Sequence, residues 1–493
     1  MARGGGPALS VTVRRYWPNA GMRGRPGDVL SNLITLPRMI ANEQAAIAAG
    51  EAVAPRRSTI WWPLAVLVAI NVLNFYDRQV AGAVVEPVRK EFLLSDTQVG
   101  GLNTAFTVLY GLVGLPLGRL ADRASRKKLL AIGIAIWALM TASARWINSY
   151  SFLVFARLGV GVGEATAAPT ATSWIGDLFP PEKRAKPLAL FMLGVPVGGA
   201  LSFFFSGPIA QRLGWRMAML AAAAPAVLLI PMLLMLREPA RGASEKHAPV
   251  AKDAGSIWAV LRVPTFWWIA ISGALVNFIL YAIAVFLPAF FSRTHHMNVA
   301  RAGVTMGIIY AIGGVLGGSV AGVWGDRIVH RSRSGRMKIA SVAALLAVPL
   351  AYVGFQMSPG HQIAFGNWWA VPLAILPLTV AYGLLNMYYG LVYASIQDIV
   401  APALRGTSMA IYFLVMYLGG ASWGSLIIGG MSDRFALHAA HLAGFDKITE
   451  QFKAIGLQQA LLLIPVLSLL LAGVLWAGSR TIGKDLEKQQ RAA

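Results

Sequence analysis

Long apolar runs separated by short polar connections dominate this chain of 493 residues. Each run matches the roughly 20 residues that a helix needs to cross the hydrocarbon core of a bilayer. The expected spans are residues 60–85, 97–118, 129–147, 150–178, 187–211, 215–236, 265–291, 302–325, 337–357, 368–397, 406–432 and 455–478. The pattern therefore predicts an all-α integral membrane protein with 12 transmembrane helices.

Composition supports this prediction. The chain is 56% hydrophobic and only 13% charged, whereas a soluble domain carries about 25% charged residues. The net charge of +22 would suit a nucleic-acid-binding protein, but Lys and Arg cluster in short turns between the apolar runs. We therefore expect a lipid bilayer and no nucleic acid as a partner. The chain has no cysteine, which excludes disulfide and thiolate-metal chemistry, and we expect no cofactor.

The basic residues also predict an orientation. Connections 2–3, 4–5, 6–7, 8–9 and 10–11 hold about twice as many Lys and Arg as the connections on the other side. Cytoplasmic loops carry such an excess. With an even number of spans, both termini are expected in the cytoplasm. The expected location is a bacterial inner membrane.

The chain is expected to divide into two six-helix halves with polar flanks. Residues 1–58 are rich in Gly, Pro and Arg and read as a disordered cytoplasmic tail. Residues 59–236 form the first half and 265–479 the second. A charged cytoplasmic linker, 237–264, joins them, and 480–493 form a second cytoplasmic tail.

The two halves resemble each other in sequence. Asp177 and Arg184 precede Gly198-Gly199 in the first half, and Asp398 and Arg405 precede Gly419-Gly420 at the same spacing in the second. Parallel repeats of a six-span unit are a transporter architecture, with the substrate site at the repeat interface near the midplane. We expect the transporter to act as a monomer.

The 2–3 loop carries the most specific motif. Residues Gly118–Lys127 resemble the major facilitator pattern G-x-L-x-D-R-x-G-R-[KR], with Ser125 at the second glycine. A shorter copy lies in the 8–9 loop. The resemblance implies a cytoplasmic gate in which an aspartate caps a helix and pairs with arginine. Its expected members are Gly118, Asp122, Arg123, Arg126, Asp177, Arg184, Asp326, Arg327, Asp398 and Arg405. The alternative is a plain basic turn.

Four charged residues lie deep inside the predicted spans: Asp77 and Arg78 in span one, Arg157 and Glu164 in span four. Intramembrane charges are costly and are functional by default. Arg157 and Glu164 are two helical turns apart and share a face. We expect Asp77 to pair with Arg157 when ionised and to release it when protonated, or else to form a permanent structural pair with it. Arg78 is expected to face another side and extend toward solvent.

Within the superfamily the chain resembles the spinster-like lipid transporters. The residues that carry the resemblance are Asn74–Arg78, Gly118–Lys127 and Arg157–Ala165. It implies a secondary active transporter for lysophospholipids or sphingoid phosphates, with proton coupling in bacterial members. Asp77 would take the proton, Glu164 would be a second carboxylate, and Arg157 would contact Asp77 or an anion. Asn74, Tyr76, Tyr388 and Tyr389 are further candidates to line the substrate site.

Other functions stay open at this point. A proton-coupled exporter of drugs or metabolites would have similar loops, and so would a symporter of a small organic solute. A membrane enzyme would need a clustered nucleophile, metal site or acid pair, which the sequence lacks. His438 and His441 are spaced for a metal, but no further ligand lies nearby in sequence, so a surface helix is expected and no metal site.

Overall fold

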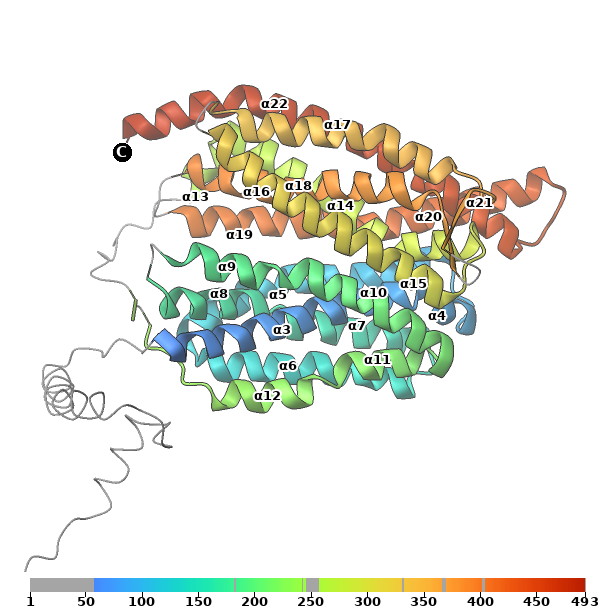
Figure 1. Ribbon diagram of the computed structural model, residues 1–493, viewed down its shortest axis with the longest axis horizontal. Helices are drawn as coiled ribbons and strands as arrows, with labels where there is room; N and C mark the ends of the chain where they lie inside the picture. The colour runs from blue at the N-terminus through green and yellow to red at the C-terminus, as the bar shows by residue number, and fades with distance from the viewer. Residues whose placement is uncertain are drawn as a thin grey trace, which may run out of the picture. The chain divides into compact units, whose positions relative to one another are not determined.

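The computed structural model describes residues 57–180, 183–241, 243–244, 257–329, 332–365, 369–400 and 404–492 (Figure 1). Within these residues, 12 helical segments are long and apolar enough to cross a membrane, which confirms the prediction of an all-α membrane protein. The predicted disordered tail lies almost entirely outside the described residues, because the first described helix begins at Arg57.

The first six spans are built from helices α3 to α12. Their bounds are α3 (Arg57–Ala83), α5 (Asp96–Arg123), α6 (Arg126–Ala142), α7 (Tyr150–Glu164) with α8 (Ala167–Leu178), α9 (Ala185–Met192) with α10 (Gly194–Leu213), and α11 (Trp215–Ala223) with α12 (Ala226–Met235). The short helices α4 (Val85–Glu91) and η1 (Ser143–Trp146) follow spans one and three. Figure 1 shows these helices as one group.

The last six spans form a second group above them in Figure 1. They are α14 (Pro264–Arg293), α15 (Val299–Ile308) with η3 (Ile309–Gly314) and α16 (Val315–Val329), α17 (Gly335–Gln356), α18 (Ile375–Asp398), α19 (Arg405–Met416) with η5 (Tyr417–Ala421) and α20 (Ser422–Leu442), and α21 (Glu450–Leu461) with α22 (Leu463–Ala492). Both η3 and η5 are π-helical. A short helix, α13 (Ile257–Leu261), precedes this group.

Two predicted boundaries are wrong. The tenth span does not begin at residue 368, because a β-hairpin of β1 (Gln362–Phe365) and β2 (Trp369–Pro372) precedes α18, with Ile363 opposite Val371. The helix of the twelfth span does not end near 478, because α22 continues through the predicted tail to Ala492. Asp485 explains this extension: its carboxylate accepts hydrogen bonds from the backbone N–H of Thr265 (3.1 Å) and its hydroxyl (2.6 Å).

The close approaches between glycines of one half and backbone of the other lie near one end of the described structure. We call the end that carries the 2–3 and 8–9 loops the basic end, and the other the opposite end. Near the opposite end, a Cβ on Gly303 of α15 would lie 2.9 Å from the carbonyl oxygen of Phe203 in α10, and one on Gly100 of α5 would collide with Ser425 of α20. Toward the basic end, a Cβ on Gly322 would meet none of the described atoms within contact distance. These close approaches therefore hold the halves together near the opposite end.

Candidate functional site

Two carboxyl groups meet in the interior of the first half. Asp77 of α3 and Glu164 of α7 are both completely buried, and they lie close enough for their charges to interact. Thr141 of α6 donates to Oδ2 of Asp77 at 2.8 Å. The remaining oxygens, Oδ1 of Asp77 and Oε1 of Glu164, receive no hydrogen bond from the described protein. Spans one, three and four together hold this carboxyl pair.

Arg78 is the partner of Glu164. Its Nε and Nη2 lie 3.0 and 2.9 Å from Oε2 of Glu164, and its side chain is only 4% exposed. The prediction that Arg78 turns away toward solvent is therefore wrong. Adjacent helical residues do point in different directions, but α3 is surrounded by protein here, so both Asp77 and Arg78 point into the interior. The guanidinium lies 4.5 Å from the ring centre of Tyr110, a cation–π contact.

Arg157 occupies the same region without a carboxylate partner. Its guanidinium lies 4.8 Å from the ring centre of Phe106, and its Nε is buried with no hydrogen bond among the described residues. No ion pair joins Arg157 to Asp77 in the part of the chain that the structure describes. The predicted pairing is thus not formed in this conformation, and the ion pair present is Arg78 with Glu164.

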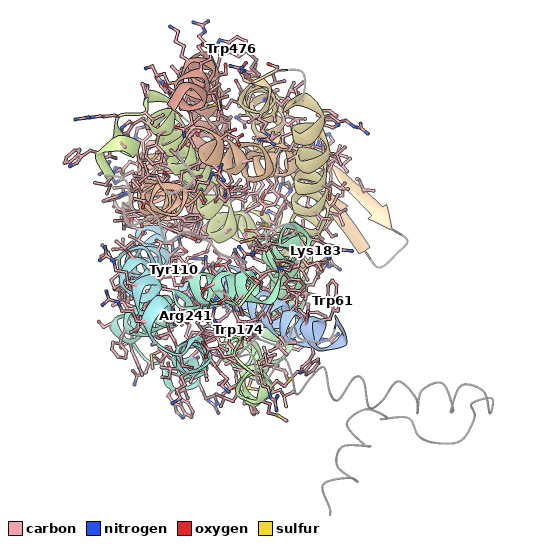
Figure 2. The ribbon with its side chains drawn as sticks, turned by 90° about the vertical axis from the view of Figure 1, so that its left-hand side faces the viewer. Trp61, Tyr110, Trp174, Lys183, Arg241 and Trp476 are labelled. Atoms are coloured by element: carbon pink, nitrogen blue, oxygen red, sulfur yellow. The ribbon has the colours of Figure 1, made fainter. Side chains whose placement is uncertain are left out.

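An aromatic cluster connects this site to the second half. Arg78 Nη1 lies 3.4 Å from the hydroxyl of Tyr281 in α14. Tyr417 of η5 has its ring 4.9 Å from Tyr110 and 6.4 Å from Tyr281. In Figure 2, Tyr110 lies on the side of its half that faces the other half. Tyr110, Tyr281 and Thr141 were missed by sequence reasoning because apolar spans contain many such residues, and only packing distinguishes these.

The other candidates of the first half lie on α3. Tyr76 accepts a hydrogen bond from Ser206 of α10 at 3.1 Å, and Asn74 is 3% exposed with its Nδ2 unpartnered among the described residues. Both residues precede Asp77 on the same helix. Asn74 therefore remains a candidate for a polar contact, whereas Tyr76 serves to join two spans of one half.

The second-half tyrosines serve different purposes. Tyr388 is 2% exposed, and its hydroxyl lies 3.0 Å from Ser272 and 3.2 Å from Tyr412. These contacts place Tyr388 in the packing of the second half in this conformation, and its role as a substrate contact stays a prediction. Tyr389 is half-buried and donates to Asn277 at 2.9 Å.

Ion pairs join each basic loop to other residues of its own half. Arg126 is fully buried and pairs with Asp177 and, at 3.1 Å, with Glu238. In the second half, Arg336 pairs with Asp398 at 3.0 Å. The same type of arginine–aspartate pair therefore joins the 2–3 loop to the end of span four and the 8–9 loop to the end of span ten.

Of the other predicted gate residues, some bond to backbone carbonyls and others are exposed. Nε of Arg184 donates to the carbonyl of Phe179 at 2.8 Å, and Nε of Arg405 donates to the carbonyl of Gln397 at 3.1 Å. Gly118 has only Pro169 of its own half near its Cβ position, and Arg123 and Arg327 are exposed. The side chains of Asp122 and Asp326 lie outside the described part of the structure.

Glu238 was not predicted, because nothing in its local sequence distinguishes it. Its carboxylate accepts from the Ser125 hydroxyl at 2.8 Å and from the Arg126 backbone N–H at 3.0 Å. Although burial raises the pKa of Glu238, these hydrogen bonds outweigh burial and lower it below its ordinary value. Ser125, which departs from the family's glycine, is therefore used as the N-cap of α6 and as a donor to Glu238.

The opposite end is closed by a buried charge network across the halves. Arg293 of α14 contacts Glu86 at 2.6 Å and Asp96 at 2.7 Å, and all three are buried. Asp433 of α20 accepts from the backbone N–H groups of Asp96 (2.9 Å) and Thr97 (2.8 Å), so its carboxylate caps the N-terminus of α5. These bonds must break if the opposite end opens.

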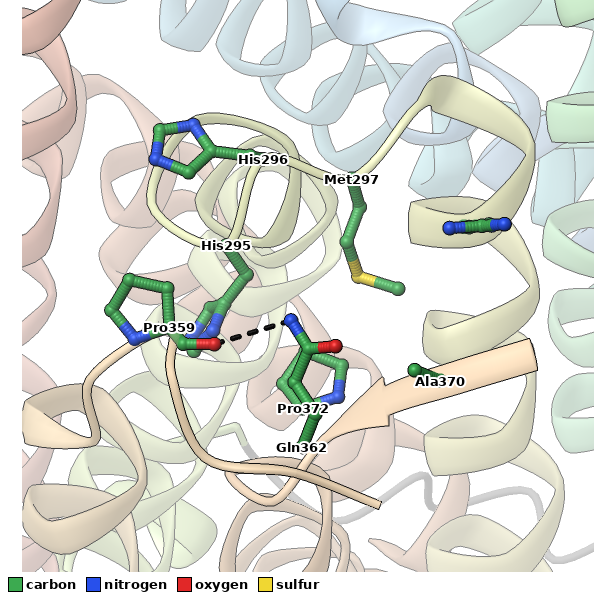
Figure 3. A pocket seen from close by; sticks show the side chains of 8 residues that line it. His295, His296, Met297, Pro359, Gln362, Ala370 and Pro372 are labelled. Carbon is green, nitrogen blue, oxygen red and sulfur yellow. Dashed lines mark hydrogen bonds between the residues drawn. The ribbon is translucent and has the colours of Figure 1, made fainter. Parts of the chain in front are cut away.

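A cavity of about 290 Å³ lies in the second half at the opposite end (Figure 3). It lies between the 7–8 connection and the β-hairpin, with His295 and Arg301 in its lining. Burial and the neighbouring His296 lower the pKa of His295 to about 4. His438 and His441 lie on α20, and the described residues contain no cluster of three or more His, Cys, Asp or Glu able to hold a metal ion.

Comparisons with known proteins agree on one family. The model of the Major Facilitator Superfamily matches residues 67–424. An MFS-type efflux pump of Mycolicibacterium smegmatis is 29% identical, covering 89% of this chain and 96% of that protein. Protein spinster homolog 1 of Homo sapiens is 27% identical, covering 75% and 72%. A bacterial homolog of the human lysosomal transporter Spinster, solved in an inward-facing and unoccupied conformation, superposes with a TM-score of 0.78 at 26% identity, covering 87% and 99%.

Proposed function

Since the chain belongs to the Major Facilitator Superfamily and is a spinster-like transporter that works by alternating access, we propose that protons drive it and that its substrate is an amphipathic lipid such as a lysophospholipid. The observation that carries the proton part is the burial of Asp77 and Glu164 in one interior site, each with an oxygen that lacks a hydrogen-bond partner among the described residues. Its relatives include an MFS-type efflux pump and a bacterial homolog of a lysosomal transporter.

The carboxyl pair suits a proton carrier. Oδ1 of Asp77 and Oε1 of Glu164 both lack a donor among the described residues, and a proton between them would give each oxygen a partner. Two carboxylates so close repel each other when both are ionised. Loss of the proton would therefore favour a rearrangement in which Asp77 turns to a cation, and Arg157 is buried nearby and available to receive it.

The coupling to the second half runs through Arg78. Its guanidinium contacts Glu164 in the first half and the Tyr281 hydroxyl in the second. A change in the charge of the carboxyl pair alters the field on Arg78 and therefore its contact with Tyr281, whose ring packs against Tyr417. A ligand or proton can shift a two-state equilibrium only through such a difference in interaction between the states.

An amphipathic anion or zwitterion fits the distribution of side chains. The charged residues buried at mid-span, including Arg157, belong to the first half, whereas the second half offers apolar and aromatic surface. A head group would bind near Arg157 and the acyl tail against the second half. Export of a drug or metabolite is the second candidate, because an MFS-type efflux pump is similar over 89% of the chain.

Uptake by reconstituted protein tests the substrate. Proteoliposomes should transport a labelled lysophospholipid, and removal of its phosphate should reduce affinity more than shortening the tail by two carbons. The tail gains little, because it leaves a bilayer that is already apolar. Tight binding of a sugar, amino acid or drug with no binding of any lysolipid would reject the lipid proposal while leaving the proton proposal intact.

The location is part of the proposal. We place the basic end in the cytoplasm of a bacterial inner membrane, with both termini on that side, because that end carries the excess of Lys and Arg. In this orientation the end closed by Arg293, Glu86 and Asp96 faces outside. The proton and the substrate would then reach the carboxyl pair from the cytoplasmic side in this conformation.

A further inference from the structure

A second cavity, of about 330 Å³, lies at the basic end of the second half. It forms where the 8–9 loop, the end of α18, the start of α19 and the C-terminal part of α22 meet. Its lining includes Arg333, Arg336, Arg405, Asp398, Ser395 and Leu486. Three guanidinium groups therefore face a cavity with one carboxylate. The volume is at the lower end of the range for small-molecule sites.

The charges in this cavity do not cancel. Asp398 is paired with Arg336 at 3.0 Å. Arg333 lies 3.4 Å from Glu487, but both side chains are more than half exposed, at 51% and 58%, and such a surface pair is weak. Arg405 uses its Nε for a backbone carbonyl. Together these contacts leave an excess of positive charge that suits an anion, and arginine binds phosphate in a bidentate manner.

The extension of α22 gives the cavity an apolar wall and a basic exterior. Ile482 and Leu486 line the cavity one helical turn apart. On the exposed side of the same helix, Arg480, Lys484 and Lys488 also follow one another at one-turn intervals, which places them along one face.

The extension is held against the start of α14, the helix that forms the seventh span. The bonds from Thr265 to Asp485 fix it against the start of α14. The helix therefore presents its basic face at the level of the lipid head groups.

We propose that this cavity binds the phosphate of an anionic phospholipid in the leaflet at the basic end. Three features combine: guanidinium groups for the phosphate, Ile482 and Leu486 for the glycerol and first methylenes, and a basic helix face that attracts negatively charged membrane surface. The inference does not depend on the transported substrate. The cavity is lined by residues of the second half alone, whereas Asp77 and Glu164 belong to the first half.

Native mass spectrometry of the purified full chain in detergent tests the site. Titration with phosphatidylglycerol should show one saturable site that phosphatidylcholine does not fill. Each basic residue near a membrane surface contributes about a fivefold effect on binding. The double variant Arg333→Gln/Arg405→Gln should therefore bind about 25-fold more weakly. Asp398→Asn removes the only carboxylate of the lining and should tighten binding about fivefold, a gain that misfolding would not produce.

Controls separate the lipid from other phosphate sources. Arg212→Gln removes an exposed arginine of the first half at the opposite end and should leave phosphatidylglycerol binding unchanged. Glycerol 3-phosphate and inorganic phosphate should bind at least tenfold more weakly than the lipid. Equal binding of these soluble anions would overturn the lipid proposal in favour of a soluble phosphate. Equal binding of phosphatidylcholine, or an unchanged affinity in the double variant, would overturn the site itself.

Discussion

Arg293 is the residue whose loss should most strongly shift the transporter between its conformations. It belongs to the second half and contacts two carboxylates of the first half, Glu86 and Asp96, and all three side chains are at least 95% buried in this network. Arg293→Gln removes the charge and leaves a shorter polar side chain. Glu86 would retain Arg89 at 3.0 Å, and Asp96 would retain only neutral hydrogen-bond donors in contact.

The magnitude follows from the burial of these charges. Removing one partner of a buried ion pair costs about 3–5 kcal/mol, because the remaining charge is left uncompensated. In a conformation open at the opposite end, water would solvate Glu86 and Asp96, so the cost falls on the closed conformation. A change of that size shifts the ratio of the two conformations by a factor of about 10² to nearly 10⁴.

Spin-label distances measure this shift directly. The chain contains no cysteine, so label pairs can be introduced without further changes. Trp146→Cys with Leu442→Cys reports on the opposite end, since both side chains are well exposed, at 71% and 76%. Leu120→Cys with Trp324→Cys reports on the basic end. In Arg293→Gln the first distance should lengthen and the second should shorten.

A matched control separates the network from a general charge effect. Arg301→Gln removes a nearby arginine that is exposed, and it should leave both distance distributions unchanged. If Arg293→Gln also leaves them unchanged, the network does not hold the opposite end closed. A shift of equal size in Arg301→Gln would show that the electrostatic field, not the buried contacts, sets the equilibrium.

Three further changes test other parts of the structure. Gly100→Ala would place a Cβ against the Ser425 carbonyl, and overpacking of this kind costs about 1–3 kcal/mol. The same spin-label pairs should therefore show fewer molecules closed at the opposite end. Unchanged distances would refute the close contact. The hydrogen bonds that lower the pKa of Glu238 stabilise the fold; this stability is complete above pH 4.5, the ordinary pKa of the group, and is lost as the pH falls through the lowered pKa. The unfolding temperature should therefore drop below pH 4.5 by more in wild type than in Glu238→Gln. Parallel curves for the two proteins would argue against a stabilising role of these hydrogen bonds. Arg157→Lys keeps the charge but loses the planar group over Phe106; the initial transport rate in proteoliposomes should fall severalfold, and full activity would leave only a point-charge role.

The spans were predictable because hydropathy depends on local sequence and the bilayer sets a length. The exceptions have local causes. The stretch around Trp369 is apolar enough to read as membrane but pairs as a strand with β1, and α22 extends because Asp485 meets Thr265 across 220 residues of sequence. No local pattern reports a contact over that separation.

The site was predictable in composition but not in pairing. The cost of burying charge singled out Asp77, Arg78, Arg157 and Glu164. Which cation faces which carboxylate depends on helix rotation by fractions of a turn, and there the expectation for Arg78 was wrong. The closing network around Arg293 was missed, because its members lie at span ends, where charged residues are ordinary.

The central claim is that Asp77 carries the coupling proton, and the variant Asp77→Asn tests it most directly. Asparagine keeps the size of the side chain and an oxygen that can accept from Thr141, but it cannot take up a proton at working pH. Reconstituted Asp77→Asn should show no substrate accumulation driven by an imposed pH gradient, while substrate exchange without a gradient continues, which shows that the protein is folded. Undiminished accumulation driven by the pH gradient in this variant would contradict the account.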